Sequence, residues 1–405
     1  MMKKNYMSQL LQGVEIEWKP LGETLIRTKG TKITAGQMKV LHKENAPLKI
    51  FAGGKTIAFV NFEDVPKKDI NREPSIIVKS RGVIEFEYYD KPFTHKNEMW
   101  SYHSNNPNIS IKFVYYFLKI NEHHFRNIGS KMQMPQIATP DTEKFKIPIP
   151  CPENPEKSLE IQSEIVRILD TFTELTAELT AELTARKKQY SYYRDQLLTF
   201  EEGEVEWKTL GEIGEFVRGN GLQKNDFAES GVGCIHYGQI YTYYGNFAYE
   251  TKSFVSSTLA NKLRKAQKGD IIIATTSENI EDVCKPLVWL GEDEVCLSGE
   301  TYIFKHSQNP KYLAYYLQTP MFFDYKKKNR TGTKVIRVHG DKLAKFEIPL
   351  PSLKEQERIV SILDKFYTLT SSITEGLPRE IELRQKQYEY YRNMLLSFPK
   401  EEVEA

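Results

Sequence analysis

The sequence predicts an α+β protein in which two α/β domains are separated by two long helical regions, with a circular, pseudo-two-fold organisation. Three observations predict this fold class: an apolar stripe over residues 154–200, a second copy of that region near the C-terminus, and two unlike β-rich segments. The predicted parts are an N-terminal piece of the repeat (1–22), a first α/β domain (23–144), a central helical region (145–211), a second α/β domain (212–345) and a distal helical region (346–405).

The apolar stripe predicts one long helix. Asn154 and Pro155 are suited to the N-cap and the first helical position. Apolar residues then recur at spacings of three or four, at Ile161, Ile165, Ile168, Phe172, Leu175, Leu179 and Leu183. Unbroken to Phe200, the helix would be roughly 70 Å long. A single globular core does not bury a helix of that length, so a partner is expected.

Comparison of the chain with itself reveals a repeat. The segment 165–172, IVRILDTF, returns at 359–366 as IVSILDKF, and a strand-like run precedes each copy, at 145–150 and 346–351. The helix ends Gln189–Arg194 and Gln387–Arg392 also match, and the E-W-K-x-L-G-E motif at 17–23 returns at 206–212. Because the tail of the repeat opens the chain, we expect a circular arrangement in which the two chain ends meet.

The two helical copies differ in one respect. Gly376-Leu377-Pro378 interrupts the second copy, and a glycine C-cap followed by a proline predicts a break there. The first copy carries the tandem tetrapeptide T-A-E-L at 176–179 and 180–183, with no breaker. Each tetrapeptide adds about 6 Å of helix and about 40° beyond a full turn. It is both a low-complexity helix, with leucine in the seam, and a candidate ruler between the two domains.

The two segments between the repeats are expected to form mixed α/β domains. Strands are predicted at 75–78 and 270–274, and helices near 111–119 and 311–323. The four cysteines lie far apart, which favours free thiols of an intracellular protein over a zinc or disulfide framework. No signal-peptide pattern and no run of 18 apolar residues occurs, so we expect a cytoplasmic protein.

No candidate catalytic motif in the sequence has the residues and spacing that its chemistry requires. The run 52–56, AGGKT, lacks the first glycine of a phosphate-binding loop, because position 49 is Lys49. The sequence contains no nucleophile elbow, zinc-binding helix or dinucleotide fingerprint, and no N-P-P-Y or D-P-P-Y tetrad for methylation of a flipped base. We therefore predict no catalytic residue, no metal ligand and no cofactor bound by this chain.

The strongest binding signal is electrostatic. The segment 324–345 contains six lysines and two arginines against two aspartates, in a chain whose formal net charge is only +2. Such a run is most often a solvated face. Here Gly332 marks a turn, and Val335, Ile336 and Val338 would anchor a strand. That strand would leave four side chains facing a polyanion, namely Arg330, Thr333, Lys334 and Arg337.

Other predicted loops carry side chains that grip phosphates or read base edges. In the first domain these candidates are Lys29, Lys32, Lys55, Lys79, Arg81, Gln133 and Gln136. In the second domain they are Arg218, Asn220, Lys224, Ser277 and Asn279. Taken one at a time these signals are weak, and the loop positions rest on composition alone.

With the repeat laid out, the chain resembles the DNA-specificity subunits of type I restriction and modification systems. The resemblance rests on Ile147–Asp170, its second copy Ile348–Asp364, the E-W-K-x-L-G-E pair and the helical Tyr-Tyr-Arg segments. The T-A-E-L tandem and the segment 373–383 resemble the IC branch of that family. The resemblance implies two target-recognition domains held apart by helices packed as an antiparallel coiled coil, each reading half of a bipartite, asymmetric double-stranded DNA target.

The resemblance also implies partners. Two methyltransferase subunits would dock on this chain, and restriction and translocase subunits would join them in the full complex. S-adenosylmethionine, ATP and magnesium would belong to those partners. Two other interpretations remain: a coiled-coil adaptor that only joins proteins, which leaves the β-rich domains without a role, and a self-contained DNA methyltransferase or nuclease, for which no motif is present.

Overall fold

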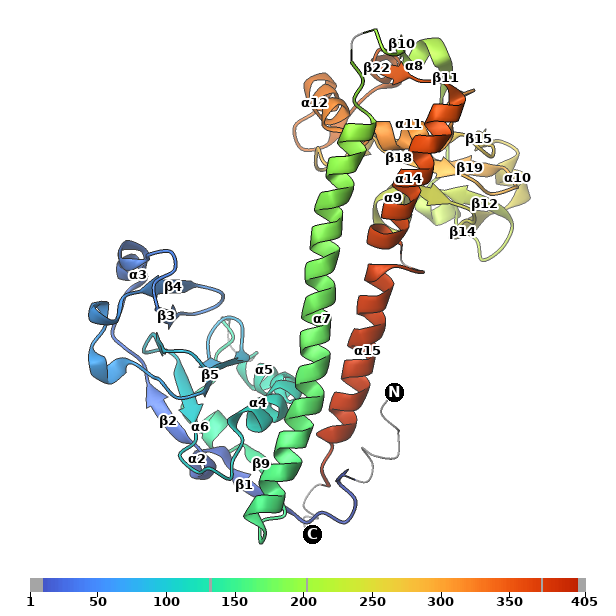
Figure 1. The fold of residues 1–405 in the computed structure, drawn as a ribbon. Coiled ribbons are helices and arrows are strands. Elements are labelled where there is room, and N and C mark those ends of the chain that lie inside the picture. The colour runs from blue at the N-terminus through green and yellow to red at the C-terminus, as the bar shows by residue number, and fades with distance from the viewer. Residues whose placement is uncertain (1–9, 131–132, 202, 373, 400–405) are drawn as a thin grey trace. The chain divides into compact units, whose positions relative to one another are not determined.

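The computed structural model of the chain describes residues 10–130, 133–201, 203–372 and 374–399. The chain divides into two compact units, each built from separate stretches of sequence. Unit 1 comprises Met1–Ala177 and Leu383–Ala405, and unit 2 comprises Glu178–Glu382. Each unit therefore contains one α/β domain together with pieces of both helical copies (Figure 1).

The predicted long helix is confirmed as α7, Pro155–Leu197. The Asn154 side chain caps its first turn by accepting a hydrogen bond from the Lys157 amide at 3.1 Å. The division between the units cuts α7 between Ala177 and Glu178, inside the T-A-E-L tandem. The tandem leucines are half-buried, as expected for residues in a helix seam.

The predicted break in the second copy is also confirmed. Helix α14, Leu353–Ser371, ends before Gly376, and α15, Leu377–Leu395, begins after it. Gly376 has a φ of +81°, and a Cβ at this position would lie 2.3 Å from the Thr368 carbonyl oxygen. Only glycine tolerates both the positive φ and the close approach of this carbonyl oxygen. The glycine therefore determines where the helix breaks.

Unit 1 carries a four-stranded antiparallel sheet in the order β2-β8-β5-β6 and a smaller sheet in the order β4-β3-β7. Its strands are β1 Ile16–Pro20, β2 Ile26–Lys29, β3 Leu48–Phe51, β4 Ile57–Val60, β5 Ser75–Lys79, β6 Glu85–Tyr89, β7 Phe93–His95, β8 Trp100–His103 and β9 Lys146–Pro150. Its shorter helices are α2 Leu21–Thr24, α3 Ala35–Leu41, α4 Ile111–Ile120, α5 Glu122–Gly129 and α6 Thr139–Glu143.

Unit 2 carries a five-stranded sheet in the order β11-β20-β16-β18-β13 and a four-stranded sheet in the order β14-β12-β19-β15. Its strands are β10 Glu206–Thr209, β11 Gly214–Arg218, β12 Val232–Ile235, β13 Phe247–Ala248, β14 Ser253–Val255, β15 Lys265–Ala266, β16 Ile271–Ala274, β17 Thr276–Ser277, β18 Lys285–Trp289, β19 Val295–Leu297, β20 Thr301–His306, β21 Ile336–Arg337 and β22 Glu347–Leu350. Its shorter helices are α8 Leu210–Ile213, α9 Tyr237–Thr242, α10 Ser257–Ala260, α11 Pro310–Tyr316, α12 Pro320–Asn329 and α13 Gly340–Leu343.

Two local expectations are corrected in unit 2. The helical stretch near 311–323 is two helices, because Thr319 caps a new helix that begins at Pro320. The strand expected around residues 335–338 is only the two-residue β21. Ile336 is buried as expected, but Val335 is 38% exposed and does not anchor the segment.

The E-W-K motifs pair with the strand-like runs in both units. In unit 1, β1 pairs with β9 in antiparallel register, with Trp18 opposite Pro148. In unit 2, β10 pairs with β22 in the same way, with Trp207 opposite Pro349. The Trp18 indole also donates a hydrogen bond to the Pro399 carbonyl oxygen at 3.0 Å. Residues near the two chain ends are thus in contact, as the circularly cut repeat predicts.

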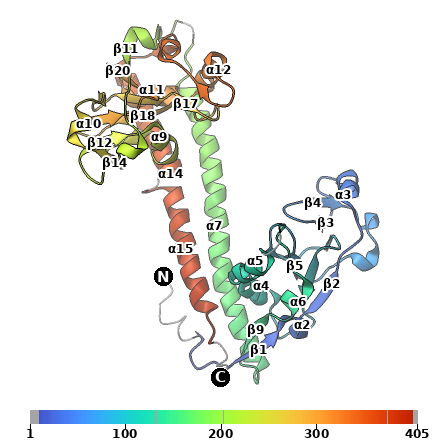
Figure 2. The same cartoon turned by 180° about the vertical axis from the view of Figure 1, so that it is seen from behind.

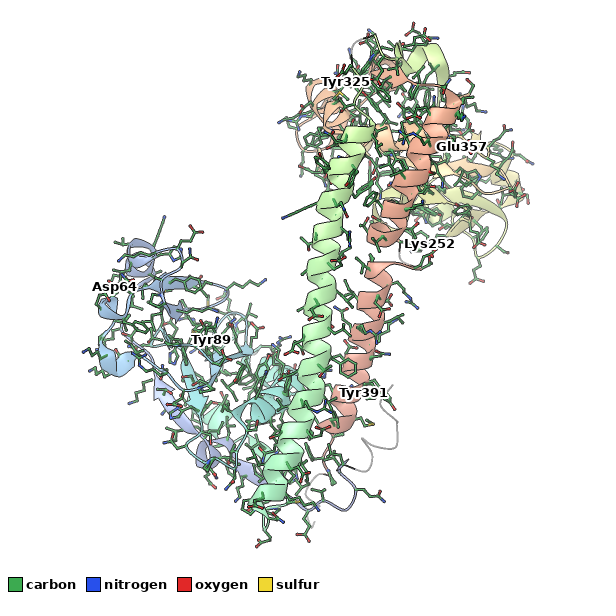
Figure 3. The ribbon with its side chains drawn as sticks, in the orientation of Figure 1. Asp64, Tyr89, Lys252, Tyr325, Glu357 and Tyr391 are labelled. Carbon is green, nitrogen blue, oxygen red and sulfur yellow. The ribbon has the colours of Figure 1, made fainter. Side chains whose placement is uncertain are left out.

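Within each unit a stacked aromatic pair joins the two helical copies. In unit 1, α7 and α15 run antiparallel (Figures 1 and 2), and the Phe172 ring stacks on Tyr391, with centroids 5.4 Å apart and planes at 24°. Figure 3 labels Tyr391 on α15, beside α7. In unit 2, Phe366 of α14 stacks on Tyr193 of α7 at 5.5 Å and 25°. Phe172 and Phe366, like Tyr193 and Tyr391, occupy matching positions of the repeat.

The cysteines are free, and Cys234, Cys284 and Cys296 are buried. Among the described residues, no helix is long and apolar enough to cross a membrane. In the same part of the chain, His, Cys, Asp and Glu side chains form no cluster of three or more that would hold a metal ion.

Candidate nucleic-acid interface

Three segments that are far apart in sequence meet at one edge of the large sheet of unit 2. Strand β17 follows the central strand β16 and pairs with β21, with Thr276 opposite Arg337 and Ser277 opposite Ile336. The Val338 amide continues this pairing by donating to the Thr275 carbonyl oxygen at 3.2 Å. Arg218 ends β11 at the same edge of the sheet. The candidates Arg218, Ser277 and Arg337 are therefore brought together.

Glu300 lies between the two arginines of this edge. Its carboxylate oxygens lie 3.8 Å from Arg218 Nη2 and 3.6 Å from Arg337 Nε, and the Thr276 hydroxyl donates a hydrogen bond to it. About a third of the Glu300 side chain is exposed. The two arginines are thus held near a shared anion and remain in reach of solvent.

The basic segment forms a short loop closed by the Thr331 and Arg337 backbones, whose amides and carbonyls exchange hydrogen bonds of 2.8 and 2.9 Å. Gly332 turns the chain with a φ of +82°. The four candidates of this segment, Arg330, Thr333, Lys334 and Arg337, are all exposed. One expected charge is absent from the surface, because Lys326 is buried and donates to the Val283 carbonyl oxygen at 2.7 Å.

Two amides predicted to read bases are instead used within the fold. Asn220 donates from Nδ2 to the Lys262 carbonyl oxygen at 3.0 Å and accepts from the Arg264 amide at 2.8 Å. Asn279 accepts from the Asp282 amide at 2.8 Å. These contacts organise loops and leave little free hydrogen-bonding capacity. Lys224 is exposed in a short turn, and neither of the strand pairings that form the edge includes it.

The same edge exists in unit 1. After the central strand β5, Arg81 pairs with Gln136, and the Ile137 amide donates to the Ser80 carbonyl oxygen at 3.0 Å. This is the counterpart of the contact between Val338 and Thr275 in unit 2. Gln133 and Gln136 are exposed. The loop 130–136 also contains Lys131 and Met132, which lie outside the described residues.

Lys29 and Lys32 line a groove of about 750 Å³ next to this edge. Arg27, which pairs with Glu143 at 2.8 Å, and Lys68 add positive charge to the groove. Asp69 and Asp64, which is labelled in Figure 3, add negative charge. Lys29 ends β2 in unit 1, as Arg218 ends β11 in unit 2. Neither Arg27 nor Lys68 was among the individual residues predicted to contact DNA, although Arg27 begins the segment 27–32, which was considered as a loop.

Lys79 differs from the expectation of an exposed phosphate contact. Its side chain is only 10% exposed and lies 2.7 Å from a Glu87 oxygen and 3.1 Å from a Glu85 oxygen. Burial lowers the pKa of Lys79, but the two glutamates outweigh this effect and raise the pKa overall. The Lys79 ammonium is therefore charged, and the carboxylates of Glu85 and Glu87 already balance its charge. Lys55 is exposed in the turn between β3 and β4, in the smaller sheet.

Glu98 is the counterpart of Glu300 in unit 1. The Ser80 hydroxyl donates to the Glu98 carbonyl oxygen at 2.5 Å, as the Thr275 amide donates to the Glu300 carbonyl oxygen at 3.1 Å. Lys96 Nζ lies 2.7 Å from the Glu98 carboxylate. Partial burial raises the pKa of Glu98, but Lys96 and the Arg81 charge outweigh it and lower the pKa overall. Neither glutamate was predicted, because the search for DNA contacts in the sequence was directed mainly at cationic and amide side chains.

Comparison with known proteins agrees with this architecture. The sequence matches the family described as the type I restriction modification DNA specificity domain over residues 26–186 and 202–383. It is 39% identical to the EcoR124I/EcoR124II specificity subunit of Escherichia coli, over 100% of this chain and 99% of that protein. It is 31% identical to a putative type I restriction enzyme specificity subunit of Haemophilus influenzae, over 98% of this chain and 100% of that protein.

The fold has a solved counterpart. The type I restriction-modification S subunit from M. genitalium covers 96% of this chain and 97% of its own, with a TM-score of 0.59 and 16% sequence identity. Two matched segments in one chain and the full-length relatives establish the family. The chain belongs to the DNA-specificity subunits of type I restriction-modification systems, which are not themselves catalytic.

Proposed function

We propose that this chain reads a bipartite, asymmetric double-stranded DNA target, with one recognition domain on each half-site. The proposed domains are residues 23–144 and 212–345. The observation that supports this most strongly is the edge that recurs in both units: Arg81 pairs with Gln136, and Thr276 pairs with Arg337. The backbone arrangement is the same and the side chains differ, as two readers of different sequences require.

The side chains at these edges suit DNA. Arginine and lysine grip phosphates, arginine also reads guanine, and glutamine reads adenine. We assign Lys29, Lys32, Arg81, Gln133 and Gln136 to one half-site. We assign Arg218, Ser277, Arg330, Thr333, Lys334 and Arg337 to the other. Lys79, Asn220 and Asn279 act within the fold in this proposal, and Lys55 and Lys224 are peripheral phosphate contacts.

The proposal includes partners. Two methyltransferase subunits dock on the helical regions, and restriction and translocase subunits complete the nuclease. S-adenosylmethionine, ATP and magnesium act in those subunits. A solved structure concerned with complex assembly of the type I restriction-modification system has the same fold, at a TM-score of 0.55, which is compatible with such a scaffold.

Selection of bound sequences from random DNA tests the proposal. The full chain with its partner methyltransferase should enrich two unlike short motifs at a fixed separation. Lys334→Ala should weaken binding to all sequences alike, because a phosphate contact carries no sequence information, whereas Arg337→Ala should relax one base position. Lys268→Ala, at an exposed lysine paired with Glu292, is the control. Enrichment of no motif by the wild-type complex would contradict the proposal.

A further inference from the structure

One acidic residue occupies the same place in both recognition edges. Glu98 and Glu300 each precede the strand that pairs with the central strand, β8 in unit 1 and β20 in unit 2. In each case the glutamate carbonyl oxygen accepts a hydrogen bond from the residue that follows the central strand, Ser80 or Thr275. These hydrogen bonds place both glutamates at the same point of the edge.

A carboxylate is costly on a surface that meets DNA, because it repels phosphates. At these two positions, basic side chains offset that repulsion. Arg218 and Arg337 lie within 4 Å of the Glu300 carboxylate, and Lys96 lies 2.7 Å from that of Glu98. About a third of each glutamate side chain stays exposed, 33% for Glu98 and 34% for Glu300. Each carboxylate is thus held in place, partly neutralised and accessible.

The chemistry of an ionised carboxylate restricts what it binds. It accepts hydrogen bonds and donates none. In the major groove, the groups that donate are the exocyclic amines of cytosine and adenine, whereas guanine and thymine present acceptors at the matching positions. A fixed carboxylate therefore selects a base with an amino group and rejects one with a carbonyl.

We propose that Glu98 and Glu300 are specificity-determining residues, each accepting a hydrogen bond from the amino group of a cytosine or adenine in its own half-site. Arg218 and Arg337 hold the Glu300 carboxylate and shield it from phosphates, and Lys96 does the same for Glu98. This inference rests on the proposed function and deepens it by naming one reader in each domain.

The test uses the full chain with its partner methyltransferase, and selection from random DNA. Glu300→Gln should relax one base position in one half-site, because the amide both donates and accepts and so admits bases that present a carbonyl. Discrimination at that position should fall by roughly 5-fold to 100-fold. Glu98→Gln should do the same in the other half-site only.

Affinity for DNA that lacks the target distinguishes a role in specificity from a structural role. Loss of a negative charge should leave that affinity unchanged or raise it, whereas a loosened domain would bind all DNA more weakly and unfold at a lower temperature. Glu292→Gln is the matched control for Glu300, since Glu292 is 83% exposed and pairs with Lys268, which lies in the turn before β16. Asp90→Asn, after β6, is the control for Glu98.

Each outcome decides the question. Relaxation at one position of one half-site, with undiminished affinity for other DNA, supports the inference. Unchanged preference, relaxation in both half-sites at once, or parallel loss of all binding would overturn it. If the wild-type complex selects no sequence, the proposed function itself fails, and this inference fails with it.

Discussion

The Tyr116 hydroxyl donates a hydrogen bond to Asp170 Oδ1 at 2.5 Å, and this contact holds helix α4 of the first domain to α7. Lys112 Nζ lies 2.7 Å from the other carboxylate oxygen. About two turns earlier on α7, Gln162 Oε1 accepts a hydrogen bond from the Ser110 amide at 2.9 Å. The domain is thus attached to the repeat helix through polar groups that the helix supplies at fixed positions.

Unit 2 repeats this attachment. Tyr315 donates to Asp364 Oδ1 at 2.7 Å, Lys311 Nζ lies 2.6 Å from Oδ2, and the Asn309 amide donates to Gln356 at 3.0 Å. Asp170 and Asp364 match in the repeat, whereas the residues that contact them lie in the segments that are otherwise unlike. Two different domains therefore present the same Lys-x-x-x-Tyr pattern to one kind of helix.

Loss of Asp170 should loosen α4 alone. Asp170→Ala leaves the Tyr116 hydroxyl and the Lys112 ammonium without their partner, which costs about 1–3 kcal/mol. Hydrogen exchange of the α4 amides should accelerate by roughly 5-fold to 100-fold, while exchange in α11 stays unchanged. Asp364→Ala is the matched variant and should give the reverse pattern. Equal acceleration in both helices would mean that the contacts are not local to each unit.

The aromatic pairs between the helical copies should couple energetically. Phe172→Leu and Tyr391→Leu each remove one ring of the stacked pair in unit 1. A double-mutant cycle on thermal unfolding should give a coupling of about 0.5–1.5 kcal/mol. Phe366→Leu with Tyr193→Leu should give a similar value. Phe172→Leu combined with Tyr193→Leu is the control, because these rings are not paired, and coupling there would contradict the assignment.

Stability should fall as the pH drops below neutrality. Burial lowers the pKa of His95 to about 4, an effect that a hydrogen bond with Lys96 and the Glu98 charge only partly offset. The unfolded chain takes up this proton near pH 6.5, and the folded chain only near pH 4. Protonation therefore favours unfolding between these values, by about 2 kcal/mol at pH 5.

Thermal unfolding of wild type and His95→Gln between pH 4.5 and 7.5 checks this. The variant should show a shallower decline in stability over that range. His339→Gln, at an exposed histidine, should keep the wild-type decline. Burial lowers the pKa of His306 in unit 2 to about 4 as well, so His306→Gln should also flatten the curve. Identical profiles for all four proteins would refute the linkage.

Deletion of Thr180–Leu183 should change the separation between the half-sites and leave their sequences alone. The deletion removes about 6 Å of α7 and rotates the remainder of the helix by about 40°. Sequencing of methylated DNA from cells that carry the system measures both properties. The double variant Thr180→Ala/Glu182→Ala keeps the helix length and should keep the separation. Altered half-site sequences in the deletion would sink the ruler hypothesis.

The repeat explains why so much of the fold was predictable. The spacing of Ile161, Ile165 and Ile168 defines the buried face of α7, and all three are at most 3% exposed. Gly376 marks the break because its backbone conformation excludes a side chain. The contact between Trp18 and Pro399 agrees with the circularly cut repeat, whereas the pairing of β1 with β9 was not predicted. Each of the predicted features depends on local sequence or on a repeat within it.

The candidate nucleic-acid interface was only partly predictable, because it depends on contacts between distant segments. Arg218, Thr276 and Arg337 meet only once three stretches have folded together. Lys79 looks like a surface lysine in sequence, but its strand is buried and two glutamates neutralise it. Asn220 looks like a base reader, but its amide holds the backbone at 262 and 264. Charge and polarity alone do not distinguish these cases.

In the proposed function, two unlike domains of one chain each read one half of a bipartite target. Its most direct test is sequencing of methylated DNA from cells that carry this chain and its partners, comparing wild type with a variant in which residues 330–337 are replaced by a glycine-serine loop. Wild type should mark one asymmetric bipartite motif, and the variant should lose or relax only one half of it. A continuous motif in wild type, or equal disturbance of both halves in the variant, would contradict the account.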